Sequence, residues 1–151
     1  MKTYNSYSNF ADVYDVATDD ECYLEWFDFV SSLVSFKPNF VLDLGCGTGK
    51  STFIFAKKFT ILGIEPSKEM VLVARRKAKK LGYKVDFQIG SAQNFKMKTK
   101  PELIISFGEM VNHILNEVEL ETALKNIYAN LSSKGLFLFG FNSLKRINEM
   151  H

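Results

Sequence analysis

The sequence lacks the features that would mark a membrane or secreted protein. No apolar run in its 151 residues approaches the roughly 20 that a membrane-spanning helix needs. Residues 1–7 mix polar and aromatic side chains and have no apolar signal-peptide core. The two cysteines, Cys22 and Cys46, show no pairing pattern. We therefore expect a cytoplasmic protein without disulfides and without a membrane partner.

Strong charge and metal-binding side chains are also scarce. The net charge of +2 is too small to argue for a nucleic-acid partner. The basic residues of segment 67–81 surround an apolar stripe without interleaved exposed aromatics, which is typical of a solvated helix face. The histidines, His113 and His151, have no ligand partners near them in the sequence. We expect neither a nucleic-acid interface nor a metal site.

What the sequence does have is an ordinary globular composition, with 46% hydrophobic and 24% charged residues. The length favours a single domain, residues 1–151, and no linker or internal repeat interrupts it. Aromatic residues recur near its start at helical spacings, at Tyr4, Tyr7, Phe10 and Tyr14. They predict a helical cap segment, residues 1–35 of the domain, that packs in the core or forms a flap over a ligand.

Residues 40–52 organise the rest of the chain: Phe-Val-Leu-Asp-Leu-Gly-Cys-Gly-Thr-Gly-Lys-Ser-Thr. A short apolar run that ends in an acid and then glycines predicts a buried strand stopping at a tight loop. Gly45, Gly47 and Gly49 would let a ligand approach the backbone closely. The pattern then becomes helical, and a helix N-terminus points free N–H groups at such a ligand.

Strands and helices alternate along the chain. Apolar runs predict strands at residues 40–44, 60–64, 84–89, 102–107 and 136–141. Helical periodicity predicts helices at residues 19–35, 50–58, 67–81 and 117–131, and a last helix that begins at Asn142. In helix 117–131 the residues expected to face inward are Leu120, Leu124, Ile127, Tyr128 and Leu131. This alternation indicates an α/β fold with a parallel sheet covered on both faces.

Three kinds of glycine loop must be separated. A Walker phosphate loop needs a glycine five residues before Gly49, where the chain has Leu44. A dinucleotide fingerprint that starts at Gly45 would need a small residue at Lys50. The observed pattern is instead Asp43-x-Gly45-x-Gly47-x-Gly49, followed by Glu65 at the end of the second strand.

This combination resembles the class I S-adenosylmethionine-dependent methyltransferases. Residues 41–49 resemble their first motif, and residues 63–67 with Met70 resemble the second. The likeness runs over nearly the whole chain, and its start is similar to small-molecule methyltransferases at Tyr7, Phe10, Ala11, Tyr14, Asp15, Tyr23 and Trp26. It implies a Rossmann-like three-layer sandwich with a mostly or wholly parallel five-stranded sheet of order 3-2-1-4-5. It also implies S-adenosyl-L-methionine as cofactor and a small-molecule acceptor.

The resemblance also assigns cofactor contacts. Glu65 would accept hydrogen bonds from both ribose hydroxyls. Asp43 would orient the loop and meet the ligand's ammonium, directly or through water. Many relatives carry Asp where this chain has Ser91, which implies weaker or water-mediated adenine recognition. The residues predicted to bind the cofactor are Tyr14, Asp43, Gly45, Cys46, Gly47, Gly49, Glu65, Pro66, Met70, Ser91, Ala92 and Phe107.

The sequence says less about the residues that would bind the methyl acceptor. Methyl transfer needs alignment and exclusion of water more than a base, so we assign no catalytic residue. The candidates near the acceptor are Tyr7, Glu109, Asn112 and His113. Family members usually continue with strands 6 and 7, which this sequence does not contain. Two alternatives stay open: a cofactor-binding fragment or non-catalytic module of a longer methyltransferase, or a short protein that completes itself through a partner, with self-association at the edge of strand 5.

Overall fold

The computed structural model describes residues 15, 20–108 and 110–143. The strands are β1 (Phe40–Leu44), β2 (Thr60–Glu65), β3 (Asp86–Ile89), β4 (Leu103–Ser106) and β5 (Leu136–Phe139). The helices are α2 (Asp20–Leu33), α3 (Lys50–Ala56), α4 (Lys68–Leu81), the short 3-10 helix η2 (Val111–His113) and α5 (Glu117–Asn130). The aromatic residues expected to form a helix before Tyr14, and residues 144–151 of the expected last helix, lie outside the described residues.

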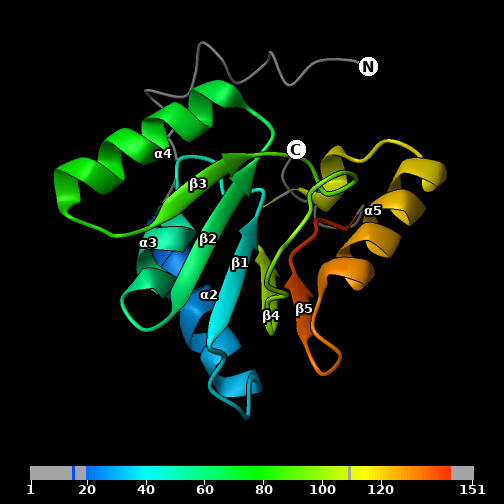
Figure 1. The fold of residues 1–151 in the computed structure, drawn as a ribbon, viewed down its shortest axis with the longest axis horizontal. Helices are drawn as coiled ribbons and strands as arrows, with labels where there is room; N and C mark the ends of the chain where they lie inside the picture. The colour runs from blue at the N-terminus through cyan, green and yellow to red at the C-terminus, as the bar shows by residue number, and fades with distance from the viewer. Residues whose placement is uncertain (1–14, 16–19, 109, 144–151) are drawn as a thin grey trace.

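The strands form a five-stranded sheet of order β3-β2-β1-β4-β5, and every pairing is parallel. This confirms the expected order and direction. Asp43 of β1 lies beside Gly63 of β2 on one side and Ile105 of β4 on the other. Because all strands run the same way, their carboxyl ends meet along one edge of the sheet, here called the rim (Figure 1). The chain order reverses at β1, the position where open α/β sheets bind ligands.

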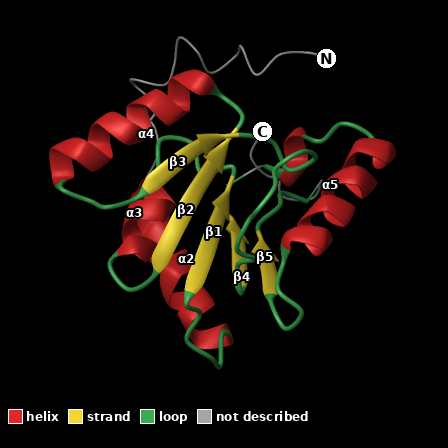
Figure 2. Ribbon diagram, in the orientation of Figure 1, coloured by secondary structure: helices red, strands yellow, loops and turns green. Residues whose placement is uncertain are grey.

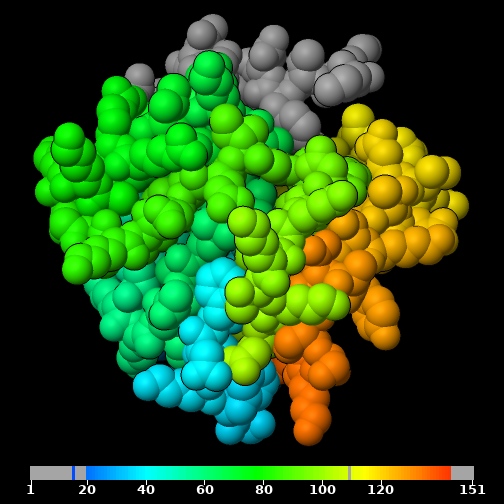
Figure 3. Space-filling view, in the orientation of Figure 1, coloured from blue at the N-terminus to red at the C-terminus, as the bar shows by residue number. Residues whose placement is uncertain are grey.

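Helices cover the two faces of the sheet unequally (Figure 2). Val41 and Leu42 are consecutive residues of β1 on opposite faces of the sheet, and both are fully buried, so the strand is apolar on both faces. Val41 packs in a cluster with side chains of α2 and α3. Leu42 packs with α5 and with the loop of residues 90–102, which crosses from β3 to β4 without a helix. This loop runs over the front of the molecule in Figure 3.

The helix α4 shows how closely sequence signals set the ends of an element. Ser67 caps its start, because its side-chain oxygen accepts a hydrogen bond from the Met70 N–H. Gly82 ends it in the left-handed conformation, at φ 75°. The buried residues of the helix include Met70, Val71 and Ala74, as its periodicity predicts. Leu81 is an exception, because 58% of it is exposed beside the final turn. Among the described helices, none is long and apolar enough to cross a membrane.

The structure corrects the expected orientation of α5. Ala123 and Ile127 are the buried residues of this helix. Leu124 and Tyr128 were expected to face inward, but they are 43% and 83% exposed. Each lies one position along from a buried residue, so the helix has two neighbouring apolar stripes and only one faces the sheet. The expected strands 84–89, 102–107 and 136–141 and the expected helices 19–35 and 50–58 were each longer than the elements observed.

Candidate cofactor-binding site

The glycine loop leaves β1 and folds back on the next strand. The N–H groups of Gly45 and Cys46 both donate to the Ile64 carbonyl of β2, at 2.8 and 3.1 Å. The Gly49 N–H donates to the Cys46 carbonyl at 2.9 Å and closes the turn before α3. The loop therefore lies across the carboxyl ends of β1 and β2, at the rim.

Two of its glycines are required for different reasons. Gly47 has a φ of 55°, and a Cβ built on it would meet no atom of the described residues within 4 Å. It therefore leaves an open face of backbone where a ligand can lie. Gly49 has a φ of 87°, and a Cβ there would lie 2.9 Å from Phe87 Cζ and 3.0 Å from Phe53 Cε2. Gly49 therefore allows the first turn of α3 to pack closely on β3.

Glu65 ends β2 and faces the glycine loop. Its Oε2 accepts a hydrogen bond from the Gly47 N–H at 3.1 Å, and its Oε1 accepts one from the Ser67 N–H at 3.0 Å. Glu65 is only 9% exposed. Burial raises the pKa of its carboxyl group, while the two backbone hydrogen bonds act in the opposite direction. Each oxygen keeps a lone pair that could accept from a ligand hydroxyl.

Asp43 lies deeper, at the end of β1, and is fully buried. Its Oδ2 accepts hydrogen bonds from Ser51 Oγ at 2.6 Å and Thr52 Oγ1 at 2.7 Å, both in the first turn of α3. Its Oδ1 is buried and has no hydrogen-bond donor among the described residues. Burial raises the pKa of Asp43 to about 6, against the two hydroxyl hydrogen bonds. A buried acceptor of this kind can accept a hydrogen bond from a ligand group or a water.

The other residues predicted to bind the cofactor stand shortly after the carboxyl ends of the strands in the sequence. They differ in how deeply they are buried. Met70, Ala92 and Phe107 are buried, whereas Pro66 and Ser91 are partly exposed. The Phe107 ring packs 5.0 Å from the Trp26 ring, on the side of α2. Cys46 is buried in the cluster between α3 and α4. Burial, and then the charges of Asp43 and Glu65, raise the pKa of the Cys46 thiol well above its usual range. A protonated, buried thiol fills space rather than reacting.

The candidates on the acceptor side are only partly described. Tyr7, Tyr14 and Glu109 lie outside the described residues. Asn112 and His113 are exposed residues of η2. The Asn112 side chain donates to the Asn142 carbonyl at 3.0 Å and accepts from its N–H at 2.9 Å, so it joins η2 to the segment after β5.

Sequence reasoning missed several residues that support the site. Ser51 and Thr52 hold Asp43, and their position in the first turn after Gly49 was a usable signal. Thr48, inside the glycine motif, is bonded to Asp15. No spacing rule could connect Asp15 to a loop 33 residues further along the chain.

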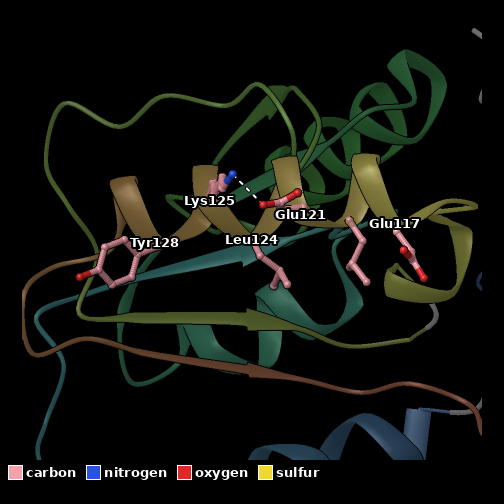
Figure 4. Close-up of a pocket in the computed structure, with 6 residues that line it drawn as sticks. Glu117, Glu121, Leu124, Lys125 and Tyr128 are labelled. Carbon is pink, nitrogen blue, oxygen red and sulfur yellow. Dashed lines mark ion pairs between the residues drawn. The ribbon is translucent and has the colours of Figure 1, made fainter.

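Two cavities of the described surface lie away from the rim. One is lined by α5 residues alone, among them Leu120, Leu124 and Tyr128 (Figure 4). Another is lined by residues at the opposite edge of the sheet, among them Val34, Phe36 and Phe59. The candidate site is identified by its backbone and its acids.

These features fit S-adenosylmethionine. Gly47 offers open backbone, Glu65 offers a carboxylate on the neighbouring strand, and Asp43 Oδ1 is an acceptor that a ligand ammonium or a bridging water could satisfy. The set does not favour a phosphate, because the Asp43 and Glu65 carboxylates lie at the loop, and the lysine that follows it, Lys50, is paired with Asp20.

Comparison with known proteins agrees with this geometry. Residues 41–135 match the family described as methyltransferase domain. A protein of Geobacillus sp. (strain WCH70) that carries the provisional name of a methyltransferase is 26% identical over 150 residues, 96% of this chain and 61% of that protein. An uncharacterized methyltransferase from the same organism is 34% identical over 137 residues, 85% of this chain and 62% of that protein.

Solved structures show the same fold. An S-adenosylmethionine-dependent methyltransferase from Clostridium acetobutylicum superposes with a TM-score of 0.77 at 26% identity, covering 96% of this chain and 61% of that one. CalS10, an amino pentose methyltransferase from Micromonospora echinaspora solved with S-adenosylmethionine bound, has a TM-score of 0.75 at 21% identity, covering 87% and 56%. The chain spans about three fifths of the length of the relatives it matches. It belongs to the methyltransferase-domain family.

Proposed function

We propose that this chain binds S-adenosyl-L-methionine at the rim and transfers its methyl group to a small-molecule acceptor. The observation that carries the proposal is the Gly47 N–H bonded to Glu65 at 3.1 Å, which holds the carboxylate beside the open face of the glycine loop. The family match and the fold support the same reaction.

Each residue then has a stated task. When bound, the cofactor supplies a methyl group already activated by the sulfonium. Glu65 binds the ribose hydroxyls, and Asp43 Oδ1 receives the ammonium of the amino-acid end or a water bound to it. The ammonium would favour the ionised form of Asp43 and lower its raised pKa. Ser91 and Ala92 contact adenine, with Pro66 and Met70 packed against adenine and ribose.

The acceptor binds above the carboxyl ends of β4 and β5. An in-line displacement at the methyl carbon needs the acceptor aligned and water excluded. Tyr7 and Tyr14 would contact the cofactor, and Glu109, Asn112 and His113 are the candidates to contact the acceptor. CalS10 is named as an amino pentose methyltransferase, which supports a small polar acceptor for this chain. We place the reaction in the cytoplasm, since Cys22 and Cys46 are free.

Calorimetric titration with S-adenosylhomocysteine tests cofactor binding. The wild-type chain should bind it, and Glu65→Gln should bind at least about tenfold more weakly, because charge-assisted hydrogen bonds to ribose are lost. Glu121→Gln is the matched control, since Glu121 pairs with Lys125 on α5. A wild-type chain that binds nothing at millimolar ligand contradicts the proposal, and equal affinity in Glu65→Gln contradicts the ribose assignment.

A second candidate is a cofactor-binding module without its own turnover, or a fragment of a longer methyltransferase. The observation that favours it is that the chain spans about three fifths of its relatives' length. Incubation of the 151-residue chain with methyl-labelled cofactor and a panel of amines, phenols and amino sugars separates the two. Label transfer above a Glu65→Gln control supports the enzyme, whereas tight binding without transfer supports the module.

We also propose that two copies of the chain associate through β5. Within the described part of the chain, β5 pairs only with β4, which leaves its other edge open. Leu136 and Phe139 at its ends are 38% and 39% exposed, and Phe141 beyond it is 64% exposed. Two such edges can pair antiparallel across a twofold axis and extend the sheet. Sedimentation velocity across a range of concentrations should show a dimer, and a monomer throughout contradicts this arrangement.

A further inference from the structure

Asp15, which precedes α2 in the chain, lies against the glycine loop. Its Oδ1 accepts a hydrogen bond from the Thr48 hydroxyl, and its Oδ2 lies 2.5 Å from Lys77 Nζ of α4. Its backbone carbonyl accepts a hydrogen bond from Lys50 Nζ at 2.8 Å. A single residue therefore connects the tip of the loop, the first residue of α3 and the middle of α4.

Both lysines have a second anchor. Lys50 Nζ also lies 2.7 Å from Asp20 Oδ1, at the first residue of α2. Lys77 Nζ lies 5.4 Å from the centre of the Phe53 ring. That ring is the one against which Gly49 packs, with Phe53 Cε2 3.0 Å from the position of a Gly49 Cβ. Asp15 is therefore connected through Lys77 and the Phe53 ring to Gly49, at the other end of the glycine loop.

Burial distinguishes these contacts from ordinary surface ion pairs, which contribute little. The Lys50 side chain is 10% exposed, that of Lys77 is 24% exposed and that of Asp15 is 30% exposed. Thr48 is 1% exposed. A carboxylate that accepts from a buried hydroxyl and a partly buried ammonium makes charge-assisted hydrogen bonds, roughly twice as strong as neutral ones.

The loop tip is therefore held from two sides. On one side Glu65 accepts from the Gly47 N–H. On the other side Asp15 accepts from Thr48, the next residue. Gly47 and Gly49 both have positive φ values, and glycine leaves such a conformation easily when nothing holds it. Release of Thr48 should let the open face of Gly47 rotate away from Glu65.

We propose that Asp15 is a positioning residue, whose carboxylate holds Thr48 and thereby keeps the glycine loop in the conformation that binds the cofactor. The effect on affinity rests on the proposed function. The effect on the loop does not, because the contacts exist in the chain itself.

The test compares Asp15→Ala with Asp28→Ala, a matched change at an exposed acid of α2. Amide hydrogen exchange by NMR, without ligand, should be about tenfold faster at Gly47 and Gly49 in Asp15→Ala and unchanged in Asp28→Ala. Titration with S-adenosylhomocysteine should show about tenfold weaker binding in Asp15→Ala alone.

A double-mutant cycle gives a readout that a general loss of stability would not produce. Thr48→Val removes the hydroxyl donor, so adding Asp15→Ala to it should weaken ligand binding by much less than Asp15→Ala does alone, because the Thr48 contact is already broken and only the ion pair with Lys77 remains to be lost. Fully additive losses overturn the proposal. If Asp15→Ala does not fold, Thr48→Val and Lys77→Met leave residue 15 in place and should show the same faster exchange at Gly47.

The two proposals fail differently. A wild-type chain that does not bind S-adenosylhomocysteine overturns the proposed function, and the exchange rates then decide the role of Asp15 by themselves. A wild-type chain that binds, with unchanged exchange and affinity in Asp15→Ala, overturns the positioning role and leaves the proposed function standing.

Discussion

The rim and the flank formed by α5 and β5 belong to one sheet but are built in opposite ways. At the rim polar side chains are buried: Asp43, Thr48 and Glu65 are 0%, 1% and 9% exposed. On the flank apolar side chains are exposed, with Leu124 at 43% and Tyr128 at 83% (Figure 4). Burying a polar group and exposing an apolar one both cost free energy unless something compensates. The two regions differ in what supplies that compensation.

At the rim most of the compensation is internal. Ser51 and Thr52 satisfy one oxygen of Asp43, and backbone N–H groups satisfy Glu65. Among the described residues, Asp43 Oδ1 is the one buried side-chain atom without a hydrogen-bond partner. On the flank nothing described covers the outer stripe of α5, because α5 is the only long helix described on its face of the sheet. The rim is thus nearly complete for a small ligand, whereas the flank needs another surface.

The largest expected difference between the regions is in stability. Phe55 of α3 is fully buried and packs edge to face on Phe27 of α2, with ring centres 4.8 Å apart. Phe55→Ala should lower the free energy of unfolding by about 3–5 kcal/mol, through lost burial and a residual cavity. Tyr128→Ala, the control on the flank, should change it by less than about 0.5 kcal/mol, because the side chain already meets water. Urea unfolding measures both, and equal losses would remove the distinction between the regions.

The pH dependence of stability is the next largest effect. Burial raises the pKa of Asp43 to about 6, whereas the unfolded carboxyl titrates near 3.8. Between these values the folded state binds more protons, so stability falls as pH rises through that window. The penalty for the ionised form at neutral pH is at most about 3 kcal/mol. Asp43→Asn should reduce this slope and raise stability at pH 7, while S-adenosylhomocysteine binds more weakly.

Unfolding by urea at pH 4.5 and pH 7 checks that prediction. The raised pKa of Glu65 adds a slope of the same sign, which Asp43→Asn leaves in place, so the slope should shrink and not vanish. Addition of ligand should restore stability to the wild-type chain at pH 7, because the ammonium favours the ionised acid. A wild-type slope retained in Asp43→Asn contradicts the assignment.

Helix caps give a smaller, matched comparison. Ser67 caps α4 at the rim through Met70 N–H at 3.3 Å, and Asn116 caps α5 on the flank through Glu119 N–H at 2.9 Å. Replacing either by Ala should lower the free energy of unfolding by about 1 kcal/mol. Only Ser67→Ala should also weaken the binding of S-adenosylhomocysteine, by about threefold, because loss of the cap loosens the start of α4 and with it the Ser67 N–H that holds Glu65. Weaker ligand binding in Asn116→Ala would show that the two regions are coupled.

The sequence predicted the rim better than the flank, for a physical reason. The glycine loop and the end of α4 follow local backbone rules, because Gly49 and Gly82 stand where a positive φ is needed. Glu65 follows from the end of its strand in the same way. The order of the sheet came from resemblance and was confirmed. The sequence of α5 alone could not predict that Leu124 and Tyr128 face outward. Helical periodicity shows that a helix has an apolar stripe, but it does not show which surface covers that stripe. The resemblance included Asp15, but its role at the loop was not predicted, because its contact with Thr48 is tertiary.

The change with the smallest expected effect on stability should have a visible effect on the assembly of two copies. Leu124 and Tyr128 lie along the cavity on the outer side of α5, which the proposed β5–β5 pairing would bring towards the same helix of the second copy. The double change Leu124→Gln with Tyr128→Ser should leave the free energy of unfolding of the monomer within about 0.5 kcal/mol of wild type. It should also weaken dimerisation measured by sedimentation velocity, because association would no longer bury apolar surface there. Glu119→Gln is a control near the start of the same helix. Dimerisation at wild-type strength in the double variant would mean that pairing through β5 does not use α5, and the exposed stripe would then need a different partner.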